Sequence, residues 1–225
     1  ILMQPDMGTS ALIFSTFLGM LFIAGVQIRQ FILVITLGFL GILALIRYVP
    51  YRWERILSFL DPWAYQNDGG YQLTLSLMAI SRGDWFGVGL GEGLMKMGYL
   101  PDAHTDFIFA IIVEEMGLLT AFIIVAVLFF LSFRCFHIAK KALDRDLYFG
   151  YFLSYGVAIL IGLHTFINVG VATGLLPTKG LTLPFISYGG TNLLIMCALS
   201  ALVLRVDHET KSSMPAVNIT RRVSF

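Results

Sequence analysis

Long apolar stretches dominate this 225-residue chain and decide what it can fold into. A helix needs about 20 mostly apolar residues to cross the hydrocarbon core of a bilayer. The stretches that approach or exceed this length are residues 8–25, 31–46, 107–133, 147–168 and 186–204. The second is the shortest, but Arg47 and Tyr48 follow it and can extend it by snorkelling. The sequence therefore predicts an all-α membrane protein, a multi-pass bundle of about five transmembrane helices.

Composition supports the same class. Hydrophobic residues make up 57% of the chain and charged residues 13%, which is not typical of a soluble globular domain. The net charge is +1 and the basic residues are scattered, so we expect no nucleic-acid partner. Cys135 and Cys197 lie at different predicted depths, so we expect two free thiols. The start at Ile1 shows no signal-peptide pattern, and we expect the chain to be the later part of a longer protein.

The basic residues predict the orientation, because short loops rich in Lys and Arg stay in the cytoplasm. They gather in the link after the first span, in the link after the third, and in the tail: Arg29; Arg134, Lys140, Lys141 and Arg145; Arg205, Lys211, Arg221 and Arg222. We therefore expect a cytoplasmic tail over 205–225. Within one domain over 1–225, a long segment over 47–105 and a shorter one over 169–185 would lie outside.

Both outer segments carry structural signals. The long one is rich in aromatic residues, which favours order at the membrane surface, and its apolar stretch 71–80 suits an interfacial or re-entrant segment. Its glycine run 87–93 resembles a phosphate cradle, but no βαβ pattern surrounds it, so flexible backbone is the better interpretation. The shorter segment is broken by Gly and Pro, which indicates the wall of a polar cavity, with Lys179 at its middle.

Asp106 is the leading candidate for chemistry. If a helix begins at Pro101 or Thr105, Asp106 lies in its first turn, where a carboxylate complements the helix dipole. However, His104 and Asp102 crowd the same position, and one carboxylate would satisfy the dipole alone. A carboxylate at the mouth of a span therefore points to catalysis as well as to capping.

Two acids follow in the same predicted span. Glu114 would lie about 12 Å below Asp106 in a straight helix. A carboxylate in hydrocarbon must be paired, neutral or in a wet cavity, so Glu114 is either functional or paired, with His164 and Asn168 as candidate partners. For Glu115 we expect structural pairing. Lys179 either snorkels to headgroups or binds an anionic group such as a diphosphate.

Several long strings carry a family resemblance. They are Gln4-Pro-Asp-Met-Gly-Thr9, Gly70-Tyr-Gln-Leu73, Tyr99-Leu-Pro-Asp-Ala-His-Thr-Asp-Phe-Ile-Phe-Ala110, Asn168-Val-Gly170 and Leu176-Pro-Thr-Lys-Gly-Leu-Thr-Leu-Pro-Phe-Ile-Ser-Tyr-Gly-Gly190. In this order they resemble the SEDS family (shape, elongation, division and sporulation) of bacterial cell-wall polymerases. Lys179 favours the division branch over the elongation branch. The resemblance implies a ten-helix fold, of which this chain would supply the latter five spans.

The resemblance also implies an enzyme, a peptidoglycan glycosyltransferase that polymerises lipid II on the outer face of the cytoplasmic (inner) membrane at the division septum. Asp106 would be the catalytic base. We assign substrate binding to Lys179, His104, Thr105, Asn168, Ser187 and Glu114. The chain departs from the family pattern at Asp102, where a glutamate is usual, and at Gly98, where division members often carry an acid.

The family resemblance also implies partners and cofactors. The expected partners are lipid II, a class B penicillin-binding protein, other division proteins and the membrane. No cofactor is certain, since no metal-ligand spacing is visible, but a divalent cation, Mg²⁺ or Mn²⁺, stays open. Two alternative functions remain at this point, because Glu114 and the broken outer segment also suit a lipid-precursor flippase, and a non-enzymatic division scaffold would need no catalytic group.

Overall fold

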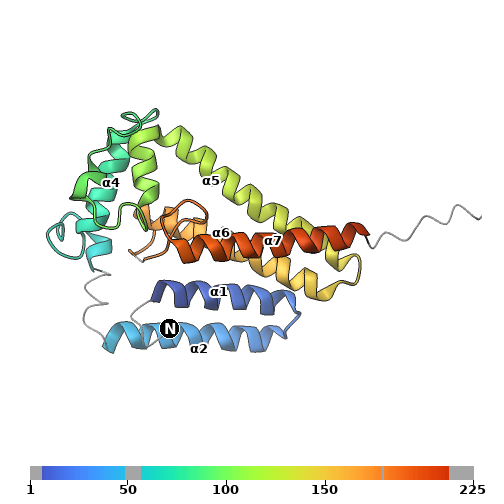
Figure 1. The fold of residues 1–225 in the computed structure, drawn as a ribbon. Coiled ribbons are helices and arrows are strands. Elements are labelled where there is room, and N and C mark those ends of the chain that lie inside the picture. The colour runs from blue at the N-terminus through green and yellow to red at the C-terminus, as the bar shows by residue number, and fades with distance from the viewer. Residues whose placement is uncertain (1–6, 49–56, 179, 213–225) are drawn as a thin grey trace, which may run out of the picture.

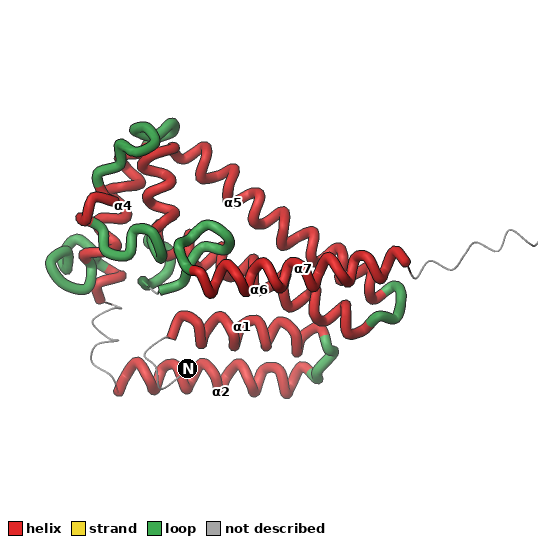
Figure 2. Tube along the Cα trace, viewed as in Figure 1, coloured by secondary structure: helices red, strands yellow, loops and turns green. Residues whose placement is uncertain are grey.

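The computed structural model describes residues 7–48, 57–178 and 180–212. These residues form helices joined by loops, with no strand among them (Figure 2). The elements are α1 (Met7–Ile23), α2 (Ile28–Tyr48), α4 (Tyr71–Gly83), a short π-helix η1 (Met95–Tyr99), α5 (Ile108–Leu143), α6 (Tyr148–Ala172) and α7 (Gly190–Ser212). The predicted all-α class is confirmed.

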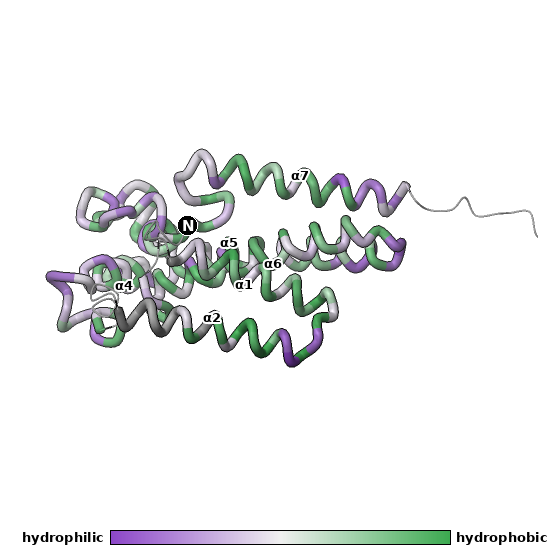
Figure 3. The backbone as a smooth tube through the Cα atoms, turned by 90° about the horizontal axis from the view of Figure 1, so that it is seen from below, coloured by the Kyte–Doolittle hydropathy of each residue, from purple (hydrophilic) through white to green (hydrophobic). Residues whose placement is uncertain are grey.

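Each predicted apolar stretch is helical. Three helices, α5, α6 and α7, are long and apolar enough to cross a membrane, and α1 and the described start of α2 are shorter apolar helices. The middles of these helices are hydrophobic and their ends are more polar (Figure 3). The second stretch forms a helix of 21 residues, longer than its apolar part suggested. The chain is thus a membrane protein in composition and in helix length.

The central pair of the bundle is α5 and α6. Helix α1 packs against α6, α2 against α1, and α7 against both α5 and α6. Glycines let α1 approach α6 closely, because a β-carbon at Gly19 would lie 2.5 Å from Ile159 and one at Gly156 would lie 3.1 Å from Met20. Small residues serve this purpose in membrane helix pairs. The bundle therefore relies on close backbone packing as well as on apolar side chains.

The connections sort to two ends of the bundle. The α1–α2 turn, the α5–α6 turn and the end of α7 lie together at one end, while α4 and the long loops lie at the other (Figure 1). The α1–α2 turn, which Arg29 follows, and the α5–α6 turn, which contains Arg145, thus lie at the same end. The outer segment over 47–105 includes α4, which packs on α5, and the last two helices reach beyond their predicted ends, to Ala172 and Ser212.

Helix α5 is bent. Gly117 has φ +81° and ψ 166°, which no residue of an α-helix adopts, and the ribbon turns sharply near this point (Figure 1). The predicted span over 107–133 is therefore not one straight helix, and Glu114 lies before the bend. The segment before Gly117 packs with α4 at the end of the bundle that carries the long loops, and the segment after it crosses alongside α6.

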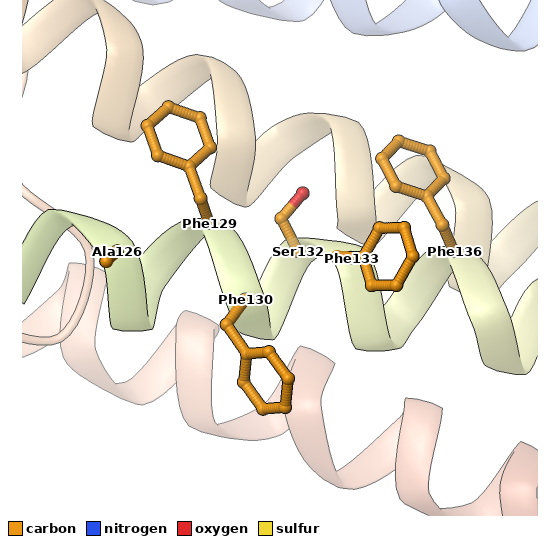
Figure 4. Close-up of a pocket in the computed structure, with 6 residues that line it drawn as sticks. All are labelled: Ala126, Phe129, Phe130, Ser132, Phe133 and Phe136. Atoms are coloured by element: carbon orange, nitrogen blue, oxygen red, sulfur yellow. The ribbon is translucent and has the colours of Figure 1, made fainter.

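An apolar hollow of about 500 Å³ lies along the middle of α5 (Figure 4). It is lined by Ala126, Phe129, Phe130, Ser132, Phe133 and Phe136. Ser132 Oγ, the single side-chain oxygen in this lining, donates to the Ala158 carbonyl at 2.7 Å. No titratable group lines the hollow, so it has the character of a surface for acyl chains rather than for proton transfer.

Candidate functional site

The turn over 101–107 presents Asp106 just before the N-terminal end of α5. Ala103 and Phe107 are buried, 5% and 2% exposed, and belong to an apolar cluster shared with α5 and α6. Asp102 has φ +55°, and its carbonyl accepts the N–H groups of Thr105, Asp106 and Phe107. Buried apolar side chains and backbone hydrogen bonds to the Asp102 carbonyl thus hold the turn in place.

This anchoring leaves the polar residues of the turn facing outward. His104 is exposed, and Thr105 and Asp106 are half-buried. The expected helix start is wrong, because α5 begins at Ile108 and Phe107 occupies the N-cap without a side-chain cap bond. Asp106 therefore precedes the N-cap and lies outside the first turn of α5.

The loop between α6 and α7 pairs with this turn. Ser187 Oγ donates to the Thr105 carbonyl at 2.6 Å, and Tyr188 N donates to the His104 carbonyl at 2.9 Å. Ser187 Oγ also accepts the Leu183 N–H at 2.6 Å, which folds the loop back on itself. Two segments more than 80 residues apart thus form one surface.

Asn168 on α6 ties both segments to the bundle. Its Nδ2 donates to the Asp106 carbonyl at 2.9 Å and to the Leu181 carbonyl at 2.6 Å. The side chain is buried, 1% exposed, so it holds the two loops from beneath. Its contact with substrate stays a prediction, and its described partners are both backbone carbonyls.

Gly180 fixes the surroundings of the Asp106 carboxylate. A β-carbon added at Gly180 would lie 3.1 Å from Asp106 Oδ2, closer than most β-carbon contacts allow. Lys179, the predicted cation, precedes Gly180 but lies outside the described residues, as do residues 4–6 of the string that begins at Gln4. The glycine therefore brings the α6–α7 loop against the acid.

An open hollow of about 410 Å³ lies beside the turn. It is lined by His104, Ile108, Ile186 and Tyr188. Two of these residues flank Asp106 in the chain, and the Tyr188 side chain is 81% exposed at its edge. This gives the surface around the turn room for a ligand with both polar and apolar groups.

Glu114 lies away from this surface, in a clamp. It is fully buried and accepts hydrogen bonds from Leu94 N at 3.0 Å and Met95 N at 3.3 Å. Arg82 of α4 pairs with it at 3.4 Å. The expected partners His164 and Asn168 are wrong, because the bend at Gly117 turns Glu114 toward α4. Its role as a substrate ligand stays a prediction.

Glu115 is paired, as expected. Lys96 Nζ lies 2.5 Å from Glu115 Oε1, and the Gly91 N–H donates to Oε2 at 3.1 Å. Together the two acids therefore hold residues 91–96, which end the loop after α4 and begin η1. That segment leads directly into the turn that carries Asp106.

The glycine-rich run packs into the bend of α5. Val88 N donates to the Glu114 carbonyl at 2.9 Å and Gly89 N to the Glu115 carbonyl at 3.0 Å, which replace the helical bonds lost there. In return, Leu118 N donates to the Asp84 carbonyl at 2.9 Å. A β-carbon at Gly87 would lie 2.2 Å from the Glu115 carbonyl oxygen. The run therefore serves close backbone approach, not the free flexibility expected from the sequence.

The structure thus groups the predicted residues unevenly. His104, Thr105, Asp106, Asn168 and Ser187 meet at one surface, and Glu114 belongs to the clamp behind it. Among the described residues no three His, Cys, Asp or Glu side chains form a metal-binding group. Sequence reasoning missed Arg82 and Gly180 as site-forming residues.

The chain is similar to proteins of one family. The model of the FtsW, RodA and SpoVE family, described as a cell cycle protein, matches residues 1–212. A protein of Aliivibrio salmonicida named probable peptidoglycan glycosyltransferase FtsW is 49% identical over 94% of this chain and 53% of its own length. Proteins of the same name from Saccharophagus degradans and Buchnera aphidicola are each 48% identical, over 93% and 94% of this chain.

One solved structure also matches. It is described as "Structural coordination of polymerization and crosslinking by a peptidoglycan synthase complex", and it superimposes with a TM-score of 0.71 at 27% identity. The match covers 93% of this chain and 57% of the other. The chain spans about half the length of the curated relatives it matches.

Proposed function

Because the chain belongs to the FtsW, RodA and SpoVE family of cell cycle proteins, we propose that it carries the catalytic surface of a peptidoglycan glycosyltransferase. In this proposal the protein polymerises lipid II into glycan at the outer face of the cytoplasmic membrane during division. The observation that best supports this proposal is the position of Asp106. It is half-buried just before the N-terminal end of α5, where two distant loops are bonded together around it.

Asp106 acts as the general base. Chain growth requires a sugar hydroxyl of one lipid-linked saccharide to attack the anomeric carbon of another, with loss of a lipid diphosphate. The carboxylate takes the hydroxyl proton as the new C–O bond forms and the bond to the diphosphate breaks. A positioned base of this kind contributes about 10²–10⁴-fold to rate. Attack from the face opposite the leaving group inverts the anomeric centre, as in inverting glycosidases.

Rigid support makes the base effective. Asn168 fixes the Asp106 carbonyl at 2.9 Å, Ser187 fixes the preceding carbonyl at 2.6 Å, and Phe107 is buried beneath. The carboxylate therefore keeps its place while substrates exchange. Positioning of this kind lowers the entropic part of the barrier.

The departing diphosphate needs positive charge. Lys179 precedes Gly180, which lies against Asp106, and we assign Lys179 to that role. A divalent cation would fit here with one or two carboxylates and the substrate diphosphate as ligands, and it would add the same charge neutralisation. His104, Thr105 and Ser187 would contact the saccharides from the surface that they share.

The membrane setting and the partner extend the proposal. With the basic loops in the cytoplasm, the C-terminus is cytoplasmic and the Asp106 surface faces outward. A class B penicillin-binding protein at the septum would cross-link the product, which accords with the matched structure, described as a complex that coordinates polymerization and crosslinking.

The test is a reconstitution of the full-length protein with its transpeptidase in vesicles that contain lipid II. We expect glycan from the wild type and none from Asp106→Asn, with equal yield and partner binding. Glycan from Asp106→Asn at the wild-type rate would refute the assignment. Polymerisation without this protein, combined with loss of lipid II flipping in its absence, would establish the flippase function instead.

A further inference from the structure

The clamp at Glu114 also closes a loop that contains Asp106. Leu94 N donates to Glu114 Oε1 at 3.0 Å, and Met95 N donates to Oε2 at 3.3 Å. These bonds join residues 20 and 19 positions apart in the chain, and Asp106 lies between them. The segment over 94–114 is therefore a closed loop that begins at η1 and ends in the second turn of α5.

The Glu114 carboxylate meets the start of η1. Leu94 is the N-cap of this short helix and Met95 is its first residue. The first N–H groups of a helix have no partner within the helix and need an acceptor, and leucine has no polar side chain to provide one. Glu114 supplies the acceptor from another helix, and its side chain is fully buried. A side chain of α5 thus fixes the beginning of η1.

The five residues of η1 connect this fixed end to the turn that carries Asp106. Leu100 N donates to the Met95 carbonyl at 2.9 Å, which closes η1 onto its own first residue. Leu100 is 3% exposed and belongs to the same apolar cluster as Ala103 and Phe107 of the turn. Met95 packs against that cluster as well. A displacement of η1 is therefore passed on to the buried side chains that hold the turn.

Two other contacts tie the loop at its surface. Tyr71 Oη donates to the Tyr99 carbonyl at 3.0 Å, and Lys96 pairs with Glu115. Tyr71 is 40% exposed and the Lys96 side chain is 25% exposed, so water competes for both contacts. Water does not reach the fully buried Glu114 side chain in the same way. The bonds to Glu114 are therefore the most costly of these contacts to break.

We propose that Glu114 is a positioning residue for Asp106, which acts by closing the loop over 94–114 at the start of η1. A loop tied at both ends has fewer accessible conformations than one tied at a single end, so closure holds the turn and its carboxylate more narrowly. The effect on rate rests on the proposed function. Closure of the loop is a property of the fold and can be measured without activity.

The test compares three variants of the full-length protein. Glu114→Ala removes both acceptors. Glu114→Gln keeps an oxygen for the Leu94 N–H but places an amide group, which cannot accept, at the Met95 N–H, and it serves as the test if Glu114→Ala does not fold. Ser76→Ala is the matched control, because it removes a fully buried hydrogen bond, from Ser76 Oγ to the Ala172 carbonyl at 2.8 Å, outside the closed loop.

Hydrogen exchange gives the readout that is independent of activity. We expect amides of residues 94–107 to exchange at least about tenfold faster in Glu114→Ala than in the wild type, with amides of α6 as the internal reference. Glu114→Gln should give a smaller increase, because it keeps one of the two bonds. In Ser76→Ala these amides should exchange at about the wild-type rate.

Kinetics give the second readout. We expect kcat per folded molecule to fall at least about tenfold in Glu114→Ala, with KM for lipid II little changed, and to fall less in Glu114→Gln. Ser76→Ala should keep the wild-type kcat. A lower kcat at constant KM is the expected result of a misplaced base, whereas loss of a substrate contact would raise KM.

The outcomes separate this proposal from the proposed function. Faster exchange over 94–107 in Glu114→Ala, together with a wild-type protein that makes no glycan, would uphold the closed loop and refute the enzyme. Exchange that stays unchanged over 94–107, or that rises equally in α6, would overturn the closed loop. Faster exchange with a wild-type kcat would overturn the positioning role. A raised KM with unchanged exchange would make Glu114 a substrate ligand and would also overturn the proposal.

Discussion

The Glu114 clamp can be tested by replacing Glu114 with alanine. The side chain is fully buried and accepts the Leu94 and Met95 N–H groups. Hydrogen bonds to a charged group are worth about 1.5–3 kcal/mol each, so the two bonds together set an upper range near 3–6 kcal/mol. Arg82 adds little to this figure, since its side chain is 38% exposed and solvent screens the pair.

We therefore expect Glu114→Ala to lower the free energy of unfolding by about 3–5 kcal/mol. Glu115→Ala is the matched control on the next residue. Its carboxylate is 12% exposed and its partner Lys96 25%, so we expect a smaller loss of about 1–2 kcal/mol. The two losses of stability differ because Glu114→Ala leaves the buried Leu94 and Met95 N–H groups without an acceptor.

The assay is equilibrium unfolding of the purified protein in detergent or bicelles, with limited proteolysis of residues 84–96 as a local readout. Glu114→Ala should be cleaved there at lower protease concentration than Glu115→Ala. Equal stability of the two variants, or wild-type stability of Glu114→Ala, would refute the clamp as the anchor of this segment.

Three further predictions concern the bend and the loops. Gly117→Ala should lower the free energy of unfolding by at least about 2 kcal/mol in equilibrium unfolding, because φ is +81° and the new β-carbon would lie 2.3 Å from the Trp85 carbonyl oxygen. Wild-type stability of this variant would contradict the bend. Gly180→Ala should reduce the polymerisation rate by about tenfold with normal folding, because the new β-carbon would press on the Asp106 carboxylate. Gly190→Ala is the control and should polymerise normally, since a β-carbon there would have no atom within 4 Å. Equal polymerisation rates of the two variants would contradict the contact between Gly180 and Asp106. Ser187→Ala should cost about 1–3 kcal/mol, because the Leu183 N–H loses its acceptor, and a change below about 0.5 kcal/mol in equilibrium unfolding would argue against the bond.

Hydropathy predicted the helices of this fold well. Length and composition were enough to predict the five apolar stretches as helices, and all five are helical in the structure. Hydropathy could not reveal the bend at Gly117, because a glycine in an apolar run is compatible with a straight helix. The backbone of residues 84–89 causes the bend by supplying the missing hydrogen bonds.

The site was predictable in part. Asp106 and its neighbours form a continuous string, so their proximity follows from the sequence. Their contact with Ser187 and Asn168 depends on tertiary packing of α6, which no local pattern encodes. The partners of Glu114 were missed for the same reason, since Arg82 lies 32 residues away on a different helix.

The central claim is that the Asp106 carboxylate removes a proton during glycan polymerisation. Steady-state kinetics of Asp106→Asn with lipid II test it most directly, because Asn keeps the size of the side chain and loses the base. We predict a fall in kcat of about 10²–10⁴-fold with KM changed by less than about threefold. A kcat within about threefold of the wild type would contradict the account.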